Sequence, residues 1–430
     1  MTDKINVLIF PCGAENAIEL HTALKDVVTV NVIGASGRSD HGQFVFKNYI
    51  GNVPYITDKS FLNFINDVVD KHNIQVIFPT HDDVALFLAE NTNRIKAKIA
   101  VAGFDQARIC RSKSATYELF KEEDFCPQVF CTGNENIAFP LFAKPDKGQG
   151  GKDAFLINEN DNRDLTSILN DGYVITEYLP GEEMTVDCFS NRHQQLLFAG
   201  SRKRNRVFGG ISVNSSTVPL TKEIEQIANR INEKLGMKGL WYFQVKKDKH
   251  DKFKLMEVSV RAAGTMNLYR GLGVNFPLLT IYDLMGYDVE IIKNDYSLEV
   301  DRALFNRYKS DLQYDIIYID FDDTIIKVDK VNSFVMLFLY NAKNEGKKIR
   351  LVTKHEHDLS KTLHDLSIHA GLFEEIIHLR PQDEKYLVIK EREKAIFIDN
   401  AYKERVKVRK ELNIPVFDVD AISTLINWKE

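Results

Sequence analysis

The sequence predicts a multidomain protein in which two α/β domains flank an α+β domain. The first reason is length, because 430 residues are more than a single hydrophobic core usually holds. The second reason is pattern: apolar strands alternate with helical segments at both ends of the chain, whereas strands with tight turns dominate the middle. We therefore expect an α/β domain over residues 1–105, an α+β domain over 106–310 and a second α/β domain over 311–430.

The first domain is predicted to be a doubly wound parallel sheet, because its strands are separated by helical segments. Strands are expected over 5–10, 27–35 and 74–80, and helices over 12–25 and 60–72. Ligands of such sheets lie at the carboxyl ends of the strands. This places Pro11–Gly13 and Thr80–Asp83 at one edge of a cleft.

Apolar periodicity and turn residues also predict the helices and strands of the other two domains. The middle domain combines hairpins with helices, which are expected over 221–236 and 276–286. The last domain returns to strand–helix alternation. Its strands are expected over 315–320, 349–353, 395–399 and 415–418, and its helices over 331–345, 358–370 and 402–411.

Bulk composition narrows the class of protein. The net charge of −5 and pI near 6.2 give no basic footprint for nucleic acid. The longest apolar run, 334–340, is far too short for a membrane span, and no signal peptide is visible. Five cysteines without a CxxC pair suggest reduced thiols. We expect a cytoplasmic protein that binds neither nucleic acid nor membranes; a homo-oligomer is possible.

A lysine and a glycine-rich segment, KPDKGQGGKD over 144–153, predict a nucleotide clamp. Glycines let backbone N–H groups approach phosphates closely, and they stand at Gly148, Gly150 and Gly151. Lys144 precedes them on a strand, where its ammonium could reach the inner phosphates. A plain P-loop is not expected, because Asp153 stands where Ser or Thr is needed. The alternative is a flexible hairpin tip.

Two further segments suit a nucleotide and its metal. The backbone at Glu177-Tyr178-Leu179 could pair with an adenine edge while Glu183 accepts from ribose hydroxyls; the alternative is a charged hairpin turn. Gln244 and Glu257 face each other if their hairpin is in register. Oxygen ligands on adjacent strands suit Mg²⁺.

These motifs, in this order, resemble the ATP-grasp superfamily, closest to the synthetase unit of carbamoyl phosphate synthetase large chains. The resemblance covers residues 1 to about 305 and makes the first domain a pre-ATP-grasp domain. It implies ATP with Mg²⁺ as cofactors, with Mn²⁺ as the alternative metal. It assigns nucleotide contacts to Lys113, Lys144, Gly148, Gly150, Gly151, Glu177, Tyr178, Leu179 and Glu183.

The resemblance also assigns metal ligands and a phosphate-holding arginine. Gln244 and Glu257 match ligand positions, and Arg261 matches the arginine. The family usually reads Glu-x-Asn-x-Arg, so Ser259 stands at the position of a further ligand, with a shorter reach than an amide.

Members of this superfamily mostly phosphorylate a carboxylate and let an amine displace the phosphate. The chain has no room for a second synthetase unit or a glutaminase. The implied activity is therefore a stand-alone carboxylate–amine ligase whose partners are small-molecule acids and amines. Nearby, Arg202, Arg204 and Arg206 either hold a carboxylate or phosphate or form a solvated charged face.

The last domain carries a second candidate site in the segment IDFDDT. A hydrophobic strand delivers Asp320 to the sheet edge, with Asp322 on the same side of the turn. One carboxylate can attack phosphorus and the other can protonate the leaving oxygen, and both can hold Mg²⁺. The alternative is an N-cap cluster after a buried strand.

Three more residues extend this candidate site: Thr353 and Asp399 end strands, and Lys385 follows a turn. With Asp320, Asp322 and Thr324 they resemble haloacid dehalogenase (HAD) phosphohydrolases. The resemblance implies Asp320 as nucleophile, Asp322 as acid/base, Thr353 and Lys385 as phosphate contacts, and Asp320, Asp322 and Asp399 around Mg²⁺.

Some residues of the last domain depart from the usual pattern of HAD phosphohydrolases. Asn400 replaces the second acid of the last motif, and Glu404 is a possible further partner. The gaps between the motifs are too short for a large cap domain, so a capless Rossmann-like domain is expected. His355 and His357 are expected to be solvated.

The combined prediction is a bifunctional enzyme, a carboxylate–amine ligase fused to a phosphatase with a phosphorylated substrate. The alternative is an ATP-binding pseudoenzyme or sensor in which the phosphatase is the only live activity.

Overall fold

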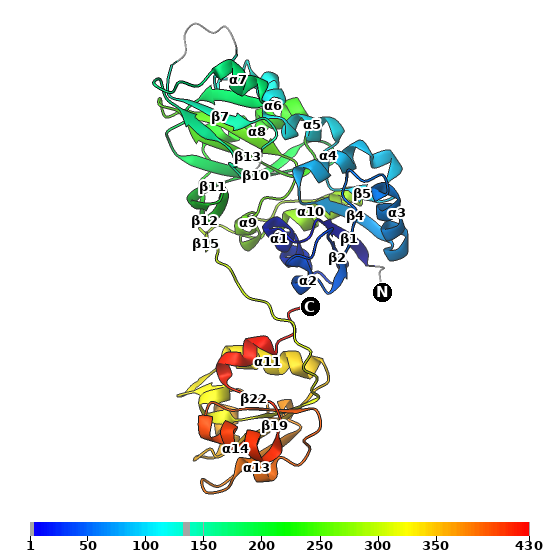
Figure 1. Cartoon of the computed structure of the whole chain (residues 1–430), viewed down its shortest axis with the longest axis vertical. Helices are drawn as coiled ribbons and strands as arrows, with labels where there is room; N and C mark the ends of the chain where they lie inside the picture. Colours follow the sequence, from blue (N-terminus) through cyan, green and yellow to red (C-terminus); the bar gives the residue numbers. More distant parts are fainter. Residues whose placement is uncertain (1–3, 132–137, 149, 430) are drawn as a thin grey trace. The chain divides into compact units, whose positions relative to one another are not determined.

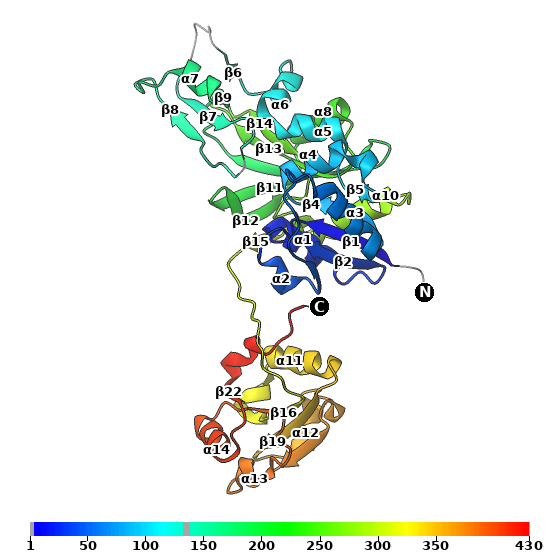
Figure 2. The same ribbon diagram turned by 45° about the vertical axis from the view of Figure 1, so that its right-hand side comes forward.

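The computed structural model describes residues 4–131, 138–148 and 150–429. It contains two compact units, Met1–Leu304 and Phe305–Glu430, which we call the N-terminal and C-terminal units (Figures 1 and 2). Among the described residues, no helix combines the length and apolarity that crossing a membrane requires.

The N-terminal unit begins with a five-stranded parallel sheet of order β3-β2-β1-β4-β5 (Figure 1). Its strands are β1 (Ile5–Phe10), β2 (Val30–Ala35), β3 (Asn48–Ile50), β4 (Ile74–Pro79) and β5 (Lys98–Ile99). Its helices are α1 (Glu15–Leu24), α2 (Gly42–Val45), α3 (Phe61–His72) and α4 (Asp82–Glu90), followed by a 3₁₀ turn at Thr92–Arg94.

Both faces of this sheet are buried, which explains why its strands read as apolar runs. Val7 and Ile9 of β1 pack in one cluster with α1, whereas Leu8 and Phe10 pack in another with α3 and α4. The predicted doubly wound arrangement of strands and helices is therefore present in the first hundred residues.

Residues 104–301 form two antiparallel sheets and their helices. A four-stranded sheet has the order β6-β9-β7-β8, and a six-stranded sheet has the order β14-β13-β10-β11-β12-β15. The small sheet contains β6 (Val129–Phe130), β7 (Leu141–Pro145), β8 (Phe155–Ile157) and β9 (Tyr173–Glu177). The large sheet contains β10 (Glu183–Ser190), β11 (Leu196–Phe208), β12 (Ile211–Val218), β13 (Gly239–Lys247), β14 (Phe253–Ser259) and β15 (Glu299–Asp301). The helices are α5 (Phe104–Arg111), α6 (Lys113–Phe120), α7 (Leu165–Asn170), α8 (Lys222–Leu235), α9 (Asn267–Gly271) and α10 (Phe276–Leu284).

The segment 178–182 passes from the small sheet to the large one, because β9 and β10 belong to different sheets. The alternative of a charged hairpin turn at this point is therefore wrong. The connection is tied to the large sheet by backbone hydrogen bonds between Gly181, Glu182 and Lys247.

The two halves of the N-terminal unit share a hydrophobic core. Val7 and Leu20 of the parallel-sheet half pack in one cluster with Phe189, Tyr242 and Phe276 of the other half. They fold as one compact unit, and the next unit starts at Phe305. The three-domain division with boundaries at 105 and 310 stays a prediction.

The C-terminal unit is a second parallel sheet, with the order β20-β19-β16-β21-β22. Its strands are β16 (Ile316–Ile319), β19 (Lys348–Thr353), β20 (Glu375–His378), β21 (Ala395–Ile398) and β22 (Val416–Phe417), with a small ribbon of β17 (Ile326–Lys327) and β18 (Lys330–Val331). Its helices are α11 (Ser333–Asn344), α12 (Leu359–Asp365), α13 (Lys385–Val388) and α14 (Tyr402–Leu412), with a π-type turn at Phe321–Ile325 and 3₁₀ turns at Ala370–Leu372 and Val419–Thr424. Strand β20 and the ribbon were not expected.

Alternate residues of the central strand β16 again face two cores. Ile317 and Ile319 pack with α11 and α12, whereas Ile316 and Tyr318 pack with α14. Strand β16 lies between β19 and β21, so the residues that follow these three strands meet at one edge of the sheet.

Candidate functional site

A cavity of about 640 Å³ in the N-terminal unit is the main candidate site. Its walls come from the start of α1, the residues after β4, both antiparallel sheets and the glycine-rich loop. Of the thirteen site residues predicted for this unit, all but Ser259 line it: Lys113, Lys144, Gly148, Gly150, Gly151, Glu177, Tyr178, Leu179, Glu183, Gln244, Glu257 and Arg261.

Lys144 is a buried cation on β7. Its Nζ donates to the phenolic oxygen of Tyr117 at 2.5 Å and lies 5.1 Å from the centre of that ring. Burial, together with the positive charge of Lys113, lowers the pKa of Lys144 to about 7. Tyr117, on α6, was not predicted as a partner of Lys144.

Lys113 opens α6 and lies beside the root of the glycine-rich loop. Its Nζ is 3.4 Å from the carbonyl oxygens of both Asp146 and Gly148. Burial lowers the pKa of Lys113 as well. The Asp146 side chain accepts from Ser112 and from the backbone N–H of Ser114, so it fastens the loop to the start of α6. Asp146 is a second residue that the sequence reading missed.

The glycine-rich loop adopts a conformation that favours glycine. Gly150 and Gly151 have φ of 61° and 65°, in the left-handed region. A β-carbon added to Gly210, at the turn between β11 and β12, would lie 1.7 Å from the carbonyl oxygen of Gly150. The two turns therefore touch through backbone atoms and form one rim of the cavity.

The predicted adenine hinge lines the cavity where the chain crosses between sheets. The Glu177 side chain accepts from the backbone N–H of Gln128 at 2.9 Å, so it supports the segment rather than facing a ligand. Tyr178 is half exposed, and Leu179 is buried.

Arg204 connects several of the predicted residues. It forms an ion pair with Glu183, donates to the Gln244 amide oxygen at 3.2 Å and donates to the Gly210 carbonyl at 2.7 Å. Arg202 is buried and bidentate on Asp187, at 2.7 and 3.2 Å. The solvated alternative is wrong for these two arginines.

The third arginine of this stretch behaves differently. Arg206 is exposed and pairs with Asp301, which is also exposed. It does not line the cavity, so the solvated alternative describes Arg206 well.

Gln244 and Glu257 are direct partners in the β13–β14 ladder, as the predicted register requires. Both line the cavity and offer one amide and one carboxylate oxygen. Such a pair fits Mg²⁺, which usually keeps waters and substrate phosphates as its other ligands. The described residues contain no cluster of three or more His, Cys, Asp or Glu side chains that could hold a metal alone.

Arg261 and Ser259 both bind Asp82, at the start of α4. The Arg261 guanidinium contacts both carboxylate oxygens, and the Ser259 hydroxyl donates to Oδ1 at 3.0 Å. Strand β14 ends at Ser259, so the strand alternation expected to align Arg261 with Glu257 does not reach it. Ser259 lies behind the cavity wall and has a partner other than the predicted metal.

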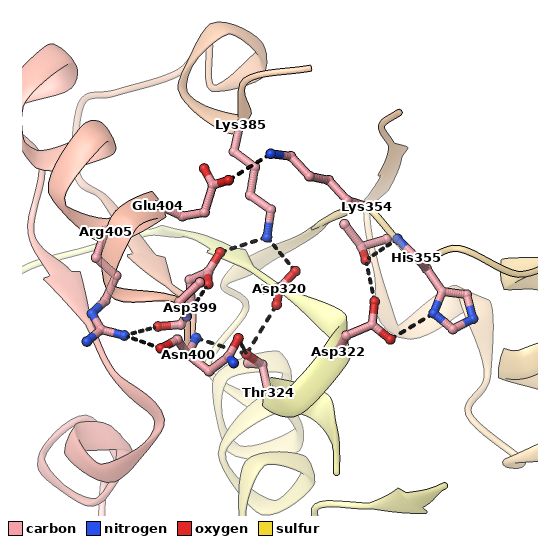
Figure 3. A network of polar contacts seen from close by, with 12 residues as sticks. Asp320, Asp322, Thr324, Lys354, His355, Lys385, Asp399, Asn400, Glu404 and Arg405 are labelled. Carbon is pink, nitrogen blue, oxygen red and sulfur yellow. Dashed lines mark hydrogen bonds and ion pairs between the residues drawn. The ribbon is translucent and has the colours of Figure 1, made fainter. Parts of the chain in front are cut away.

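The C-terminal unit holds a second polar cluster at the carboxyl ends of β16 and β21 (Figure 3). The Lys385 Nζ lies 2.5 Å from Asp320 Oδ1 and 2.7 Å from Asp399 Oδ2. All three side chains are buried. Burial and the charge of Asp399 raise the pKa of Asp320 to about 7 although Lys385 opposes the shift. Two acidic side chains and one lysine therefore share a small buried site.

Asp322 stands beside this cluster on the π-type turn. Its carboxylate accepts from the Thr353 hydroxyl at 3.4 Å and contacts His355 Nδ1 at 2.8 Å (Figure 3). The other ring nitrogen of His355 contacts the Thr362 hydroxyl at 2.9 Å. His355 is buried, so the expectation that it is solvated is wrong; His357 is exposed, as expected.

Two further predicted residues have other partners. Glu404 pairs with Lys354 at 2.7 Å, and the side-chain oxygen of Asn400 accepts from the Thr324 hydroxyl at 3.4 Å. The same hydroxyl lies 3.4 Å from Asp320 Oδ2, so Thr324 links Asn400 to the cluster.

Comparison with known proteins bears on the N-terminal unit. Residues 170–303 match the family described as ATP-grasp in the biosynthetic pathway with Ter operon. No curated protein matches the chain.

Several solved structures are similar in fold. A biotin carboxylase from Campylobacter jejuni is 14% identical, with a TM-score of 0.57 over 68% of this chain and 74% of that one. N5-carboxyaminoimidazole synthetase from Staphylococcus aureus, complexed with ADP, is 14% identical, with a TM-score of 0.55 over 67% and 79%. An L-amino acid ligase from Bacillus licheniformis is 16% identical, with a TM-score of 0.52 over 66% and 75%.

At these identities the similarity shows the fold alone. The chain has a mixed α/β structure with an ATP-grasp-like fold. The family match ends at residue 303, so the HAD-like assignment of residues 311–430 stays a prediction.

Proposed function

We propose that the N-terminal unit is an ATP- and Mg²⁺-dependent ligase that joins a carboxylate to an amine through an acyl phosphate. The observation that carries the proposal is the convergence of buried Lys144, Lys113 and the glycine-rich loop on one cavity with Gln244 and Glu257. The ATP-grasp-like fold supports the same reaction class.

Each group has a role in this reaction. The two lysines and the loop N–H groups bind the phosphates, and Gln244 and Glu257 hold Mg²⁺, which offsets the phosphate charge. A substrate carboxylate oxygen attacks the γ-phosphorus, and ADP leaves. The amine nitrogen then attacks the acyl carbon, phosphate leaves and the nitrogen loses a proton.

Release of ADP from MgATP tests this proposal. The purified chain is expected to release ADP when a suitable acid and amine are both present, and little with either alone. A screen of acids crossed with amines identifies the pair. Binding of MgATP without turnover in any combination would favour the ATP-binding sensor, an alternative suggested by Ser259 in place of the usual asparagine.

We further propose that the C-terminal unit is a capless HAD-type phosphatase that requires Mg²⁺. The observation that favours it is the Asp320–Lys385–Asp399 cluster, with Asp322 and Thr353 beside it (Figure 3). Asp320 attacks phosphorus, the leaving oxygen takes a proton from Asp322, and water then hydrolyses the aspartyl phosphate. Within the described part of the chain, Asp320, Asp322 and Asp399 do not form a complete metal site by themselves; they would contribute carboxylate oxygens to a Mg²⁺ whose other ligands are water and the substrate phosphate.

Phosphate release from p-nitrophenyl phosphate tests this second activity. The full chain is expected to hydrolyse the ester with Mg²⁺ and to stop when EDTA removes the metal. The chain is tested with this ester and with a broad panel of phosphomonoesters over a range of Mg²⁺ concentrations. If none is hydrolysed, the Asp320–Lys385–Asp399 cluster has a structural role and is not a phosphatase site.

A further inference from the structure

We propose that Glu15 and Arg302 bind the two charged ends of an amino acid substrate inside the N-terminal cavity. The inference rests on the proposed ligase function, because it names the chemical class of one of the two substrates. Both residues line the same cavity as the nucleotide-binding candidates.

The two side chains converge at Gly264, which also lines the cavity. A β-carbon added to Gly264 would lie 3.1 Å from Arg302 Nη1, 3.3 Å from Glu15 Oε1 and 2.8 Å from Glu15 Cγ. The absence of a side chain at this position therefore keeps open the space between an acid and a base.

Arg302 differs from the other arginines of the cavity. Arg202, Arg204 and Arg261 each form an ion pair with a carboxylate. Among the described residues, Arg302 forms no such pair, and its Nη1 donates to the Ser212 carbonyl at 3.2 Å. Burial lowers the pKa of Arg302, and the charges of Glu15 and of Glu19, which itself pairs with Arg270, oppose that shift.

Glu15 also forms no ion pair among the described residues, although its charge acts on Arg302. Glu15 lies in the first turn of α1, where a carboxylate is favourable in any case. The inference therefore depends on its position opposite Arg302 and not on the helix end. The Arg302 backbone is fixed by a hydrogen bond from its N–H to the Val213 carbonyl at 2.7 Å.

Opposite charges that lie close together but remain unpaired suit a ligand that carries both. A guanidinium binds a carboxylate well, and a carboxylate accepts from an ammonium. A simple acid would satisfy Arg302 and leave Glu15 unmatched, and a simple amine would do the reverse. An α-amino acid carries both groups on one carbon, which matches a site with both charges around one small space.

The experiment measures ADP release with MgATP and each of the twenty common amino acids, alone and in pairs. The best amino acid is then compared with the analogues that lack its α-amino or its α-carboxylate group. We expect deletion of the α-group that does not react to lower kcat/KM by about tenfold or more, as for loss of a hydrogen bond to a charged group, whereas deletion of the reacting group should abolish turnover.

Variants locate the effect at the proposed residues. Arg302→Gln and Glu15→Gln should raise the KM for the amino acid by about tenfold or more. They should leave calorimetric affinity for a non-hydrolysable ATP analogue unchanged. Gly264→Ala should act in the same way by filling the space. Arg108→Gln and Asp105→Asn remove an exposed ion pair outside the cavity and serve as controls, and circular dichroism checks that each variant is folded.

Two results would overturn the inference but leave the ligase intact. One is turnover with an acid and an amine of which neither is zwitterionic, with no activity from amino acids. The other is an unchanged KM in folded Arg302→Gln and Glu15→Gln. Failure of the wild-type chain to bind the ATP analogue would instead overturn the proposed function and, with it, this inference.

Discussion

Arg261 and Asp82 form a two-point ion pair, with Nε 2.9 Å from Oδ1 and Nη2 3.0 Å from Oδ2. Arg261 follows β14, an edge strand of the large sheet, and Asp82 opens helix α4 of the parallel-sheet half. The pair therefore joins the two halves of the N-terminal unit. It also neutralises the guanidinium to which the ATP-grasp resemblance assigns a phosphate contact.

Replacing Asp82 with Asn should show separately how much the ion pair stabilises the fold and how much it neutralises Arg261. Both side chains are mostly buried, so loss of the pair is expected to lower the free energy of unfolding by about 1.5–3 kcal/mol. MgATP should then stabilise the variant more than the wild type, because phosphate supplies the missing negative charge. Thermal unfolding with and without MgATP measures both. The control is Asp83→Asn, because Asp83 is the neighbouring and more exposed aspartate.

If MgATP raises the unfolding temperature of Asp82→Asn and of the wild type by the same amount, Arg261 is not a phosphate contact.

Replacing Lys144 with Ala should remove a phosphate contact. Loss of one charge-assisted hydrogen bond costs about 1.5–3 kcal/mol, so ATP affinity should fall by about tenfold or more. Isothermal titration calorimetry measures it. Lys147→Ala is the matched control, because Lys147 is exposed and does not line the cavity. If folded Lys144→Ala and the wild type bind ATP with equal affinity, the assignment of Lys144 to the nucleotide clamp is wrong.

The pKa of Lys144 near 7 predicts that nucleotide binding depends on pH. Phosphates favour the ammonium form, so they raise this pKa in the complex. Between about pH 7 and the higher pKa of the complex, binding must take up close to one proton, and affinity should fall as pH rises by up to about tenfold per unit. Calorimetry at pH 8 in buffers of different ionisation enthalpy counts the protons. In Lys144→Met the uptake should disappear; its persistence there would assign it to another group.

Replacing Asp320 with Asn should abolish phosphatase activity while ADP release by the N-terminal unit continues. The amide keeps the shape but lacks the nucleophilic charge, so a loss of about 10³-fold or more is expected. Asp322→Asn should still form a phosphoenzyme from p-nitrophenyl phosphate and then stall. Asp323→Asn is the control, because Asp323 is exposed and Asn tolerates its φ of 55°. Full activity of Asp320→Asn would make the cluster structural.

His355 is predicted to position Asp322, with which it shares a 2.8 Å contact. His355→Ala should slow phosphoenzyme hydrolysis by about 10- to 100-fold, as loss of an orienting partner does elsewhere, with little change in KM. His355→Asn, which can still donate to Asp322, should recover part of the rate. His357→Ala is the control on an exposed neighbour. If folded His355→Ala hydrolyses the phosphoenzyme as fast as the wild type, His355 contributes only to packing and does not position Asp322.

Local patterns predicted much of the fold and the candidate site. Alternation of apolar residues indicated the parallel strands. The pairing of Gln244 with Glu257 was also expected, but it depends on a shift of register between Gln244 and Val245 that the turn between β13 and β14 does not determine. Twelve predicted residues share one cavity because their motifs follow strand ends and turns, where position along the chain largely decides position in space.

Local sequence patterns could not predict contacts between residues that lie far apart in the chain. Asp82 binds residues 177 and 179 positions away, and no local signal marks it as their partner. Tyr117 lies on a short helix of mixed polarity with no pattern that marks it as a site residue, yet its hydroxyl contacts Lys144. His355 sits in a polar segment, but packing against the Phe321 ring at 5.3 Å removes it from solvent.

Three of the four arginines in the N-terminal cavity, Arg202, Arg204 and Arg261, are matched by Asp187, Glu183 and Asp82. A small monovalent anion that approaches such a guanidinium competes with a carboxylate already in place, and it gains little from the exchange. A polyphosphate presents several charges at once and can replace more than one internal partner. The resident carboxylates therefore lower the free energy that chloride or a single carboxylate would gain at these three arginines, and they favour ligands of higher negative charge.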